Sequence, residues 1–400
     1  MKIAFLTSGG IAPCLSSSVA SLIQNYNNKS YNNEYIGYLN GYYGLLKGKS
    51  IPLNFNSNEE LKNLKKFGGT ILGNSRVKLT NTQDCVKNGY VKENEIPLEV
   101  AANQLLKDNI DILHTIGGDD TNTTACDLAM FLKDKGYDLT VVGLPKTIDN
   151  DVYPISQTLG ADTAAEQGAI FFENIVNENT TSRRQLIIHE VMGRNCGWLT
   201  AATARKYRER LKLKNFNNQN GLNDKCWDIH AIYIPEDNID VSQESLRLGE
   251  IMNRYDCVNV FLSEGAGVDN IIKDLEMKGT QIKRDAFGHV RLDEINPGKW
   301  YADKIADWTN AKKILVQKSG YFARSAAPNK NDISLIDKIS EKAVEYALDK
   351  RSGVAGLSDD HRQEIRCIDF THIKGGKPFD CNQSWYVEML NEIGQKKDKK

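Results

Sequence analysis

The sequence contains no long apolar run. None of its uninterrupted hydrophobic stretches approaches the roughly 18 residues that a helix needs to cross a bilayer. The apolar run at the beginning of the chain, within MKIAFLTSGG, is also too short for a secretion signal. We therefore expect a soluble protein that acts in the cytoplasm and has no membrane partner.

An excess of charge of one sign is equally lacking. The chain has 51 Lys and Arg residues against 52 Asp and Glu residues, which gives a formal net charge of −1 at pH 7. Nucleic acids and anionic membranes both attract concentrated positive charge, so neither is expected as the main partner. Any phosphate that the protein binds must then be held by a few local positive groups.

Paired cysteines are missing as well. The eight cysteines are scattered along the chain, and no C-x-x-C pair occurs that would indicate a zinc site or a redox centre. We expect reduced thiols that mostly pack in the interior. What the chain does have is length, because 400 residues are enough for a large buried core and for two domains.

Short apolar runs rich in β-forming residues alternate with longer helical patterns through most of the chain. This alternation predicts an α/β fold of the doubly wound class, in which parallel strands are joined by helical crossovers. We expect strands at residues 2–7, 110–116, 139–144, 185–191, 229–234, 258–262 and 314–317. We expect helices from about residue 13 and at residues 121–135, 161–177, 196–210, 242–255 and 333–350. Polar residues collect just after the strand ends, where open α/β sheets bind their ligands.

The first of these strand ends carries the paired glycines Gly9 and Gly10, followed by a helix that starts near Pro13. Glycines there let backbone N–H groups approach an anion at the start of the helix, where the helix dipole also favours negative charge. An ordinary tight turn explains the same residues equally well.

The second strand end carries Asp119 and Asp120, between two glycines and a predicted helix. Carboxylates repel phosphate, so their useful role beside one is to hold Mg²⁺ while the metal bridges to phosphate oxygens. The alternative is that one of the two aspartates caps the helix that follows.

The third strand end reads Pro145-Lys146-Thr147-Ile148-Asp149-Asn150-Asp151. In an extended segment Asp149 and Asp151 point the same way, so one can act as a base while the other orients a cation. Lys146 adds a mobile positive charge. The alternative is a turn rich in Asp and Asn that happens to contain one lysine.

The fourth strand end carries Met192-Gly193-Arg194 after the strand expected at 185–191. An arginine at this place can form a bidentate contact with a phosphate or bind a sugar hydroxyl, and the alternative is a surface or inter-strand ion pair. The convergence of four such strand ends favours a phosphate-binding site over four separate local explanations.

The second, third and fourth of these segments resemble motifs of the phosphofructokinase family, whereas the first loop departs from the family near Cys14 and Ser16, where many members have glycine and asparagine. Three further segments resemble the family in the same order, namely residues 68–76 (GGTILGNSR), 262–265 (LSEG) and 321–324 (YFAR). The resemblance extends over nearly the whole chain and is specific because the motifs occur together. It implies two doubly wound domains with mainly parallel sheets and an active site in the cleft between them.

The same resemblance implies a chain that crosses back between the domains. The expected pyrophosphate- and Mg-binding domain comprises residues 1–158 plus about 319–368. The expected sugar-phosphate-binding domain comprises about 159–318 plus 369–400.

Two positions point to the pyrophosphate-dependent branch of the family. ATP-using members typically carry glycine at the positions of Asp120 and Lys146, and pyrophosphate-dependent members resemble this sequence at both. The Asp120 side chain would fill and charge the space that a nucleotide's α-phosphate needs, while Lys146 can neutralise the compact pyrophosphate.

The implied reaction is a reversible, Mg²⁺-dependent phosphoryl transfer of glycolysis and gluconeogenesis. Pyrophosphate donates a phosphoryl group to O1 of fructose 6-phosphate, and the products are fructose 1,6-bisphosphate and phosphate. By resemblance Asp149 is the base, Thr147, Lys146 and Asp120 complete the catalytic set, and Asp119 serves Mg²⁺. Gly10, Arg76 and Lys146 are expected to hold the pyrophosphate, because phosphoryl transfer depends mainly on positive groups and metal.

The resemblance also assigns the sugar phosphate to a set of residues and implies a homo-oligomer. The expected contacts are Thr147, Ile148, Asp149, Met192, Gly193, Arg194, Glu264, Tyr321 and Arg324. The segment around His289 is an alternative counterpart of Tyr321 and Arg324, and we expect His289 to be structural. Related enzymes complete this site with an arginine from a neighbouring subunit, so a homodimer or homotetramer is expected, and the sequence does not decide whether Arg183 or Arg184 has that role.

Three other functions compete with this interpretation. An ATP-dependent phosphofructokinase is disfavoured by Asp120 and Lys146. A catalytically silent regulatory subunit should have lost one of Asp119, Thr147, Asp149 or Arg194, all of which are present. A dinucleotide-binding oxidoreductase needs G-x-G-x-x-G after the first strand, and Gly9-Gly10-Ile11 does not supply it.

Overall fold

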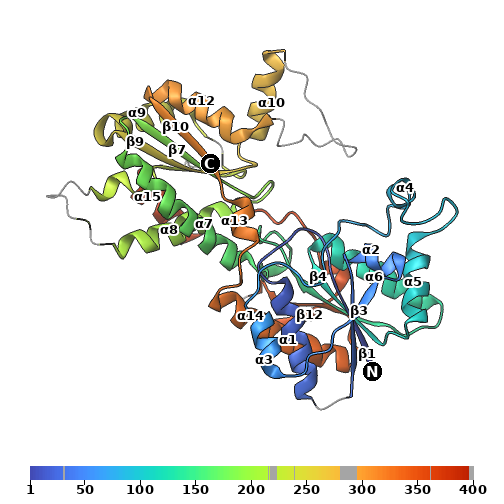
Figure 1. Ribbon diagram of the computed structural model, residues 1–400. Coiled ribbons are helices and arrows are strands. Elements are labelled where there is room, and N and C mark those ends of the chain that lie inside the picture. Colours follow the sequence, from blue (N-terminus) through green and yellow to red (C-terminus); the bar gives the residue numbers. More distant parts are fainter. Residues whose placement is uncertain are drawn as a thin grey trace. The chain divides into compact units, whose positions relative to one another are not determined.

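The structure is a computed structural model that describes residues 1–29, 32–214, 216, 223–237, 239–279, 295–360 and 362–395 (Figure 1). The chain forms two compact units, of which unit 1 comprises Met1–Thr163 with Arg324–Lys377 and unit 2 comprises Ala164–Ala323 with Pro378–Lys400. The first two divisions fall within helices α7 (Ala161–Ile175) and α13 (Gly320–Arg324). The sequence analysis places the boundaries near residues 158, 319 and 368, close to strand ends.

Unit 1 is built on a mainly parallel sheet in which the described strands have the order β12-β11-β5-β4-β1-β2-β3, with β6 paired to β11. The strands are β1 (Lys2–Thr7), β2 (Glu34–Tyr38), β3 (Ser50–Pro52), β4 (Ile112–Gly117), β5 (Thr140–Pro145), β6 (Ile155–Gln157), β11 (Gly353–Ser358) and β12 (Ile365–Ile368). Strands β2, β1, β4, β5 and β11 are parallel neighbours. Strands β3, β6 and β12 pair with their neighbours in the antiparallel sense.

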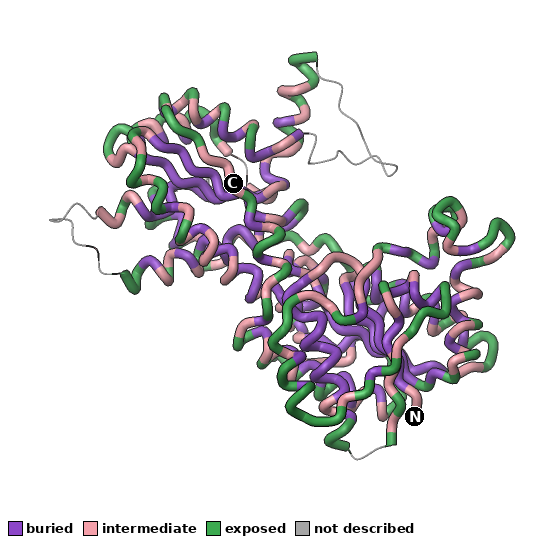
Figure 2. The backbone as a smooth tube through the Cα atoms, viewed as in Figure 1, coloured by how far each residue is buried: buried purple, intermediate pink, exposed green. Residues whose placement is uncertain are grey.

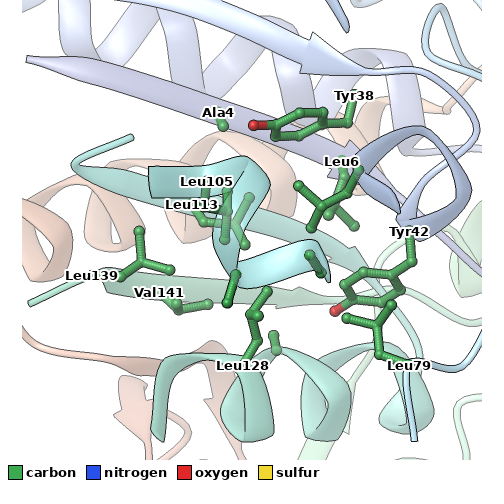
Figure 3. Packing of buried hydrophobic residues seen from close by; sticks show 14 of the residues in the cluster. Ala4, Leu6, Tyr38, Tyr42, Leu79, Leu105, Leu113, Leu128, Leu139 and Val141 are labelled. Atoms are coloured by element: carbon green, nitrogen blue, oxygen red, sulfur yellow. The ribbon is translucent and has the colours of Figure 1, made fainter. Parts of the chain in front are cut away.

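Helices cover both faces of this sheet. They are α1 (Leu15–Asn28), α2 (Tyr42–Lys47), α3 (Asn58–Leu64), α4 (Thr82–Lys87), α5 (Pro97–Lys107), α6 (Asp119–Asp134) and α14 (Lys330–Leu348), with a short 3₁₀ helix η4 (Phe370–His372). On one face, Leu6 and Leu113 of the strands pack in a buried cluster with Leu105 of α5 and Leu128 of α6 (Figure 3). Because side chains alternate along a strand, Phe5 lies on the other face. There it stacks on His114, whose ring is hydrogen-bonded to Tyr26 of α1.

Unit 2 is built on a parallel sheet whose described strands have the order β10-β7-β9-β8. The strands are β7 (Gln185–Val191), β8 (Ala231–Tyr233), β9 (Cys257–Ser263) and β10 (Lys313–Lys318). The helices are α7, α8 (Trp198–Lys212), α9 (Val241–Tyr255), α10 (Val268–Met277), α12 (Pro297–Thr309), α13 and α15 (Ser384–Glu392), with 3₁₀ helices η1 (Val176–Thr180) and η3 (Asp224–Cys226). Every residue of β7 and β9 is buried (Figure 2), as expected for strands of a parallel sheet covered on both faces.

The predicted fold class is confirmed, since both sheets are mainly parallel and their strands alternate with helices. Strands β1 and β7 have the predicted bounds, and the other five predicted strands are present with shifted ends. Strands β2, β3, β6, β11 and β12 were not predicted. In the described part of the chain, no helix is both long and apolar enough to span a membrane.

Candidate active site

In unit 1 the carboxyl ends of three neighbouring parallel strands, β1, β4 and β5, lie at one edge of the sheet. The backbone N–H of Ser8 donates to the carbonyl of Ile116 at 3.1 Å, and the N–H of Lys146 donates to the carbonyl of Gly117 at 2.8 Å. The loops that follow the three strands are therefore in direct contact. This is the edge at which open α/β sheets bind ligands.

Lys146 is the central positive group of this edge. Only 4% of the residue is exposed, and its Nζ donates a hydrogen bond to the carbonyl oxygen of Gly10 at 2.6 Å. Burial lowers the pKa of Lys146 from 10.5 to about 8, with Arg76 acting in the same direction and Asp149 and Asp151 opposing it. The structure thus brings together Gly10, Arg76 and Lys146, the three residues predicted to hold pyrophosphate.

Gly9 shapes the loop that faces Lys146. Its φ is +82°, a conformation that favours glycine, and a Cβ atom there would lie 3.3 Å from the Nζ of Lys146. The Gly9 N–H and the Ser8 hydroxyl both donate to the carbonyl of Ser75, at 2.9 and 3.0 Å. These two bonds fasten the segment that carries Arg76 to the glycine loop, so the loop is a tight turn that lies beside Arg76 and Lys146.

Asp119 and Asp120 are the first two residues of α6, which begins two residues earlier than predicted. The N-cap is Gly118, and no side chain caps this helix end, so the capping interpretation of the two aspartates is wrong. Negative charge in the first helical turn is nevertheless favoured by the helix dipole. The carboxylate of Asp120 forms an ion pair with Lys78 at 2.9 Å. The carboxylate of Asp119 lies against Gly375, so a Cβ atom added at Gly375 would be only 2.0 Å from the Asp119 Oδ2.

Asp119 and Asp151 are the two residues at this edge whose carboxylates suit the binding of a divalent cation. Burial raises the pKa of Asp151, and the neighbouring Asp119 carboxylate raises it further, as expected for two like charges close together. Among the described residues, no group of three or more His, Cys, Asp or Glu side chains could hold a metal by itself. Mg²⁺ is usually bound by one or two carboxylates together with substrate phosphates and water, so two carboxylates beside a phosphate cradle suit it.

The loop after β5 is held by a network that the sequence did not reveal. Asn150 has a φ of +54° and accepts a hydrogen bond on its Oδ1 from the N–H of Thr158 at 2.8 Å. The hydroxyl of Thr158 donates to the carbonyl of Thr147 at 2.7 Å. The Thr147 hydroxyl accepts from the N–H of Asp149 at 3.2 Å and donates to Asp151 at 3.4 Å. These bonds fix the backbone on both sides of Asp149.

The same network corrects one sequence argument. The expectation that Asp149 and Asp151 share a face assumes an extended segment, and the left-handed conformation of Asn150 interrupts it between them. Ile148, predicted to contact the sugar, is 7% exposed and forms part of the packed interior of the loop. Asparagine is one of the few residues other than glycine that tolerate this backbone conformation, which is the signal in the sequence that was overlooked.

In unit 2 the loops after the parallel strands β7 and β9 interlock. Gly193 has a φ of +129°, and a Cβ atom there would lie 2.5 Å from the carbonyl oxygen of Cys196. Its N–H donates to Glu264 at 3.3 Å, and its carbonyl accepts from the hydroxyl of Ser263 at 2.5 Å. Only glycine fits this position, which places Met192-Gly193-Arg194 directly beside Glu264.

Glu264 sits in a mostly buried environment at the end of β9. Burial raises the pKa of Glu264, while the Gly193 N–H and the positive charges of Lys318 and Arg194 favour its ionised form. Gly265 packs against the next loop so closely that a Cβ atom there would lie 1.8 Å from the carbonyl oxygen of Arg194. Glu264 and Arg194, both predicted to contact the sugar phosphate, are therefore neighbours.

Helix α13 follows β10 and carries Tyr321 and Arg324. Its first residue, Gly320, lies against Met192, since a Cβ atom at Gly320 would be 2.8 Å from the Met192 Cγ. Tyr321 is 80% exposed, and Arg324, three residues later, lies on the same side of the helix. The segment around His289 lies outside the described residues.

The two arginines left open by the sequence differ in their surroundings. The Arg184 guanidinium donates to the carbonyl of Asn310 and the side chain of Asn253, both at 3.0 Å, and to the carbonyl of Thr309 at 2.5 Å. The Arg183 side chain is 91% exposed and forms an ion pair with Asp256 at 3.1 Å. Arg184 is thus used inside its own unit, whereas Arg183 faces solvent.

Comparison with known proteins identifies the family of the chain. The phosphofructokinase family pattern matches residues 2–347. A protein of Methylomonas methanica named "Pyrophosphate--fructose 6-phosphate 1-phosphotransferase" is 54% identical over 396 residues, which cover 99% of this chain and 97% of that protein. A protein of the same name from Mastigamoeba balamuthi is 49% identical over 398 residues, with coverage of 100% and 97%.

A solved structure shares the fold. The crystal structure of the pyrophosphate-dependent phosphofructokinase from Marinobacter aquaeolei is similar with a TM-score of 0.71 at 19% identity, over 100% of this chain and 93% of that chain. The loops after β1, β4, β5, β7 and β9 therefore carry their polar residues on a fold already known from this group of enzymes. From its sequence and its fold, the chain belongs to the phosphofructokinase family.

Proposed function

We propose that this protein transfers a phosphoryl group reversibly from pyrophosphate to O1 of fructose 6-phosphate, giving fructose 1,6-bisphosphate and phosphate. The observation that carries the proposal is the buried Lys146 ammonium, bound to the Gly10 carbonyl in the same cradle as Arg76. A compact, highly charged donor needs such concentrated positive charge. The relatives from Methylomonas methanica and Mastigamoeba balamuthi bear the name of this activity.

The glycine loop, Arg76 and Lys146 hold the pyrophosphate. The backbone N–H of Gly10 lies ahead of α1, where the dipole of the helix also favours an anion. Arg76 offers a planar set of donors that suits phosphate oxygens, and Lys146 acts as a point charge. Because the protein does little covalent chemistry in phosphoryl transfer, these groups supply much of the transition-state stabilisation.

Asp119 and Asp151 are the residues that would hold Mg²⁺. When bound, Mg²⁺ neutralises charge on the phosphate oxygens of the donor. This role is supported by the position of Asp119 in the first turn of α6 and by Gly375, which leaves room for its carboxylate. Asp151 adds the second negative charge, which the nearby Thr147 hydroxyl orients by its hydrogen bond.

Asp149 is the base of the reaction. It takes the proton from the O1 hydroxyl as this oxygen attacks the phosphorus, and the bond from phosphorus to the leaving phosphate breaks. The Thr147 hydroxyl, which accepts from the Asp149 N–H, and the Asn150 network hold the base in place. Lys146 stabilises the negative charge on the departing phosphate.

The loops of unit 2 and helix α13 bind the sugar phosphate. Sugar contacts of Thr147, Ile148 and Asp149 remain a prediction from the sequence. Glu264 accepts from sugar hydroxyls, and Arg194 and Arg324 offer positive charge to phosphate groups. Met192 and Gly193 form the backbone wall, and Tyr321 is exposed for contact with the 6-phosphate.

We further propose a homodimer or homotetramer that acts in the cytoplasm, in which a subunit donates one arginine to its neighbour's sugar site. Arg183 is the better candidate because its side chain faces solvent, whereas the Arg184 guanidinium is bound within its own unit. Two other functions fit less well. An ATP-dependent enzyme would need space at Asp120, and a silent subunit would have no need for the intact set of Asp119, Thr147, Asp149 and Arg194.

The reverse reaction tests the proposed function. Fructose 1,6-bisphosphate, Mg²⁺ and phosphate are incubated with the enzyme, and the phosphorus NMR spectrum is followed over time. The appearance of a pyrophosphate signal together with fructose 6-phosphate supports the proposal. A reaction that proceeds only when ADP replaces phosphate would instead identify an ATP-dependent enzyme.

A further inference from the structure

Lys78 forms an ion pair with one of the two aspartates at the start of α6. Its Nζ lies 2.9 Å from the Oδ2 of Asp120, and the side chains of Lys78 and Asp120 are 47% and 63% exposed. Neither the motifs of the sequence nor the proposed reaction gives Lys78 a role. The pair connects the segment that carries Arg76 with the helix that carries Asp119.

The backbone around Lys78 is firmly anchored. Its neighbours Val77 and Leu79 are 6% and 1% exposed and belong to the buried cluster of unit 1. The carbonyl of Lys78 accepts from the N–H of Asn81 at 3.1 Å and from the thiol of Cys85 at 3.5 Å. With apolar side chains turned inward on both sides, the Lys78 side chain is held at the rim of the phosphate cradle.

Asp120 creates an electrostatic conflict at this rim. Its carboxylate lies at the start of a helix whose first turn also carries Asp119, and Asp149 and Asp151 add negative charge to the same edge of the sheet. A carboxylate at Asp120 takes up the space that a nucleotide donor needs, but an uncompensated negative charge would also repel pyrophosphate. A positive partner neutralises the charge of Asp120, so pyrophosphate is no longer repelled, while the side chain still occupies the space that a nucleotide needs.

We propose that Lys78 is a positioning and specificity residue that acts through Asp120. Their ion pair holds the Asp120 side chain in place as a steric barrier to nucleotides and neutralises its charge toward pyrophosphate. The inference rests on the proposed function, since it assumes pyrophosphate as donor. It predicts that Lys78 matters for donor binding only while Asp120 is charged.

A double-mutant cycle tests this dependence. The variants are Lys78→Met, which removes the charge and keeps the length, Asp120→Asn, which removes the charge and keeps the size, and the two combined. Lys135→Met is the matched control, because Lys135 and Glu99 in the same unit form a pair at 3.0 Å with exposures of 47% and 42%. The KM for pyrophosphate, kcat, and calorimetric binding of pyrophosphate are measured for each protein at low salt and at roughly 0.5 M salt.

The inference predicts that Lys78→Met raises the KM and the dissociation constant for pyrophosphate about threefold to tenfold at low salt, with kcat little changed. The rise should shrink at high salt and be absent when Asp120→Asn is the background. Lys78→Arg should restore wild-type binding, and Lys135→Met should bind pyrophosphate as the wild type does.

Two results would overturn the inference. An equal rise in the Asp120→Asn background would mean that Lys78 contacts the donor directly, and unchanged binding in Lys78→Met would mean that the pair is inert. A different result would reject the proposed function itself: a wild-type enzyme that is active with ATP and inactive with pyrophosphate. In that case the calorimetric cycle still decides whether Lys78 acts through Asp120 on the bound anion.

Discussion

The Nζ of Lys146 lies 2.6 Å from the carbonyl oxygen of Gly10, so the loop after β5 is joined to the loop after β1 across the end of the strand between them, β4. This bond holds an ammonium group beside the glycine loop that precedes α1. A positive group that is held in place loses little free energy to reorganisation when an anion enters.

The charge of Lys146 should make pyrophosphate binding depend on pH. Since burial lowers the pKa of Lys146 to about 8, the ammonium is present below that pH and is lost as the pH rises through it. Affinity for pyrophosphate should therefore fall above about pH 8. Calorimetric titrations at a series of pH values measure this fall.

Lys146→Arg provides the control for this prediction, because arginine stays charged throughout the range. The titration of pyrophosphate itself affects both proteins equally, so the difference between them reports the lysine alone. Identical pH profiles for the wild type and Lys146→Arg would show that the Lys146 charge does not hold the donor.

Asp149→Asn should lower kcat by about 100-fold or more, because it removes the general base while keeping the size of the side chain. The affinity for fructose 6-phosphate should change little. Steady-state rates together with calorimetric binding of fructose 6-phosphate separate the two effects. Near-normal turnover would show that Asp149 is not the general base.

Gly375→Ala should weaken the binding of Mg²⁺ at Asp119. The added Cβ atom would lie 2.0 Å from the Asp119 Oδ2, so the carboxylate must move. The Mg²⁺ concentration needed for half-maximal activity should rise, while pyrophosphate binding without metal stays as in the wild type.

Gly376→Asn is the matched control for Gly375→Ala. Gly376 has a φ of +75°, which asparagine tolerates, and a Cβ atom there meets no atom within 4 Å. This variant should need no more Mg²⁺ than the wild type. The same Mg²⁺ requirement in Gly375→Ala and the wild type would contradict the assignment of Asp119 to the metal.

Asn150→Gly should reduce stability and turnover together. Glycine accepts the φ of +54°, but it lacks the Oδ1 that accepts from the Thr158 N–H and the Nδ2 that donates to the Ser156 carbonyl at 3.1 Å. Loss of these buried bonds should lower the free energy of unfolding by about 1–3 kcal/mol.

Urea unfolding and kcat measure the two consequences, and Asn150→Ala adds the strain of a left-handed alanine to the same losses. Asn150→Ala should therefore be less stable than Asn150→Gly. A variant with normal stability and normal kcat would show that the network does not position the base.

The sheets were largely predictable because their central strands are buried along their whole length. The run from Gln185 to Val191 is apolar except for Gln185, His189 and Glu190, and the strand has the predicted bounds. Strand β12 is only four residues long and Ile368 is its one buried residue, and β2 begins with the exposed Glu34, so neither forms a long buried apolar run. Their pairing depends on neighbours far away in the sequence.

Candidate site residues could be selected from the sequence where they directly follow a strand. Gly10, Asp119 and Lys146 follow strands whose carboxyl ends lie at one edge of the sheet of unit 1, and Arg194 follows β7 in the separate sheet of unit 2. Gly375 approaches Asp119 through a distant segment of the chain, and no local pattern shows such a contact.

Contacts between loops could not be predicted from the sequence for a similar reason. The pair between Lys78 and Asp120 depends on the path of an irregular segment held by Val77 and Leu79. The Asn150 network depends on a single left-handed residue, which the local sequence pattern does not distinguish from an extended one.

The most direct test of the central claim is the specificity of the phosphoryl donor. The rate of fructose 1,6-bisphosphate formation from fructose 6-phosphate and Mg²⁺ is measured with pyrophosphate and with ATP, and kcat/KM is compared for the two donors. Lys146 in the cradle and Asp120 at its rim predict turnover with pyrophosphate and none above background with ATP. Turnover with ATP and not with pyrophosphate would contradict the roles of both residues.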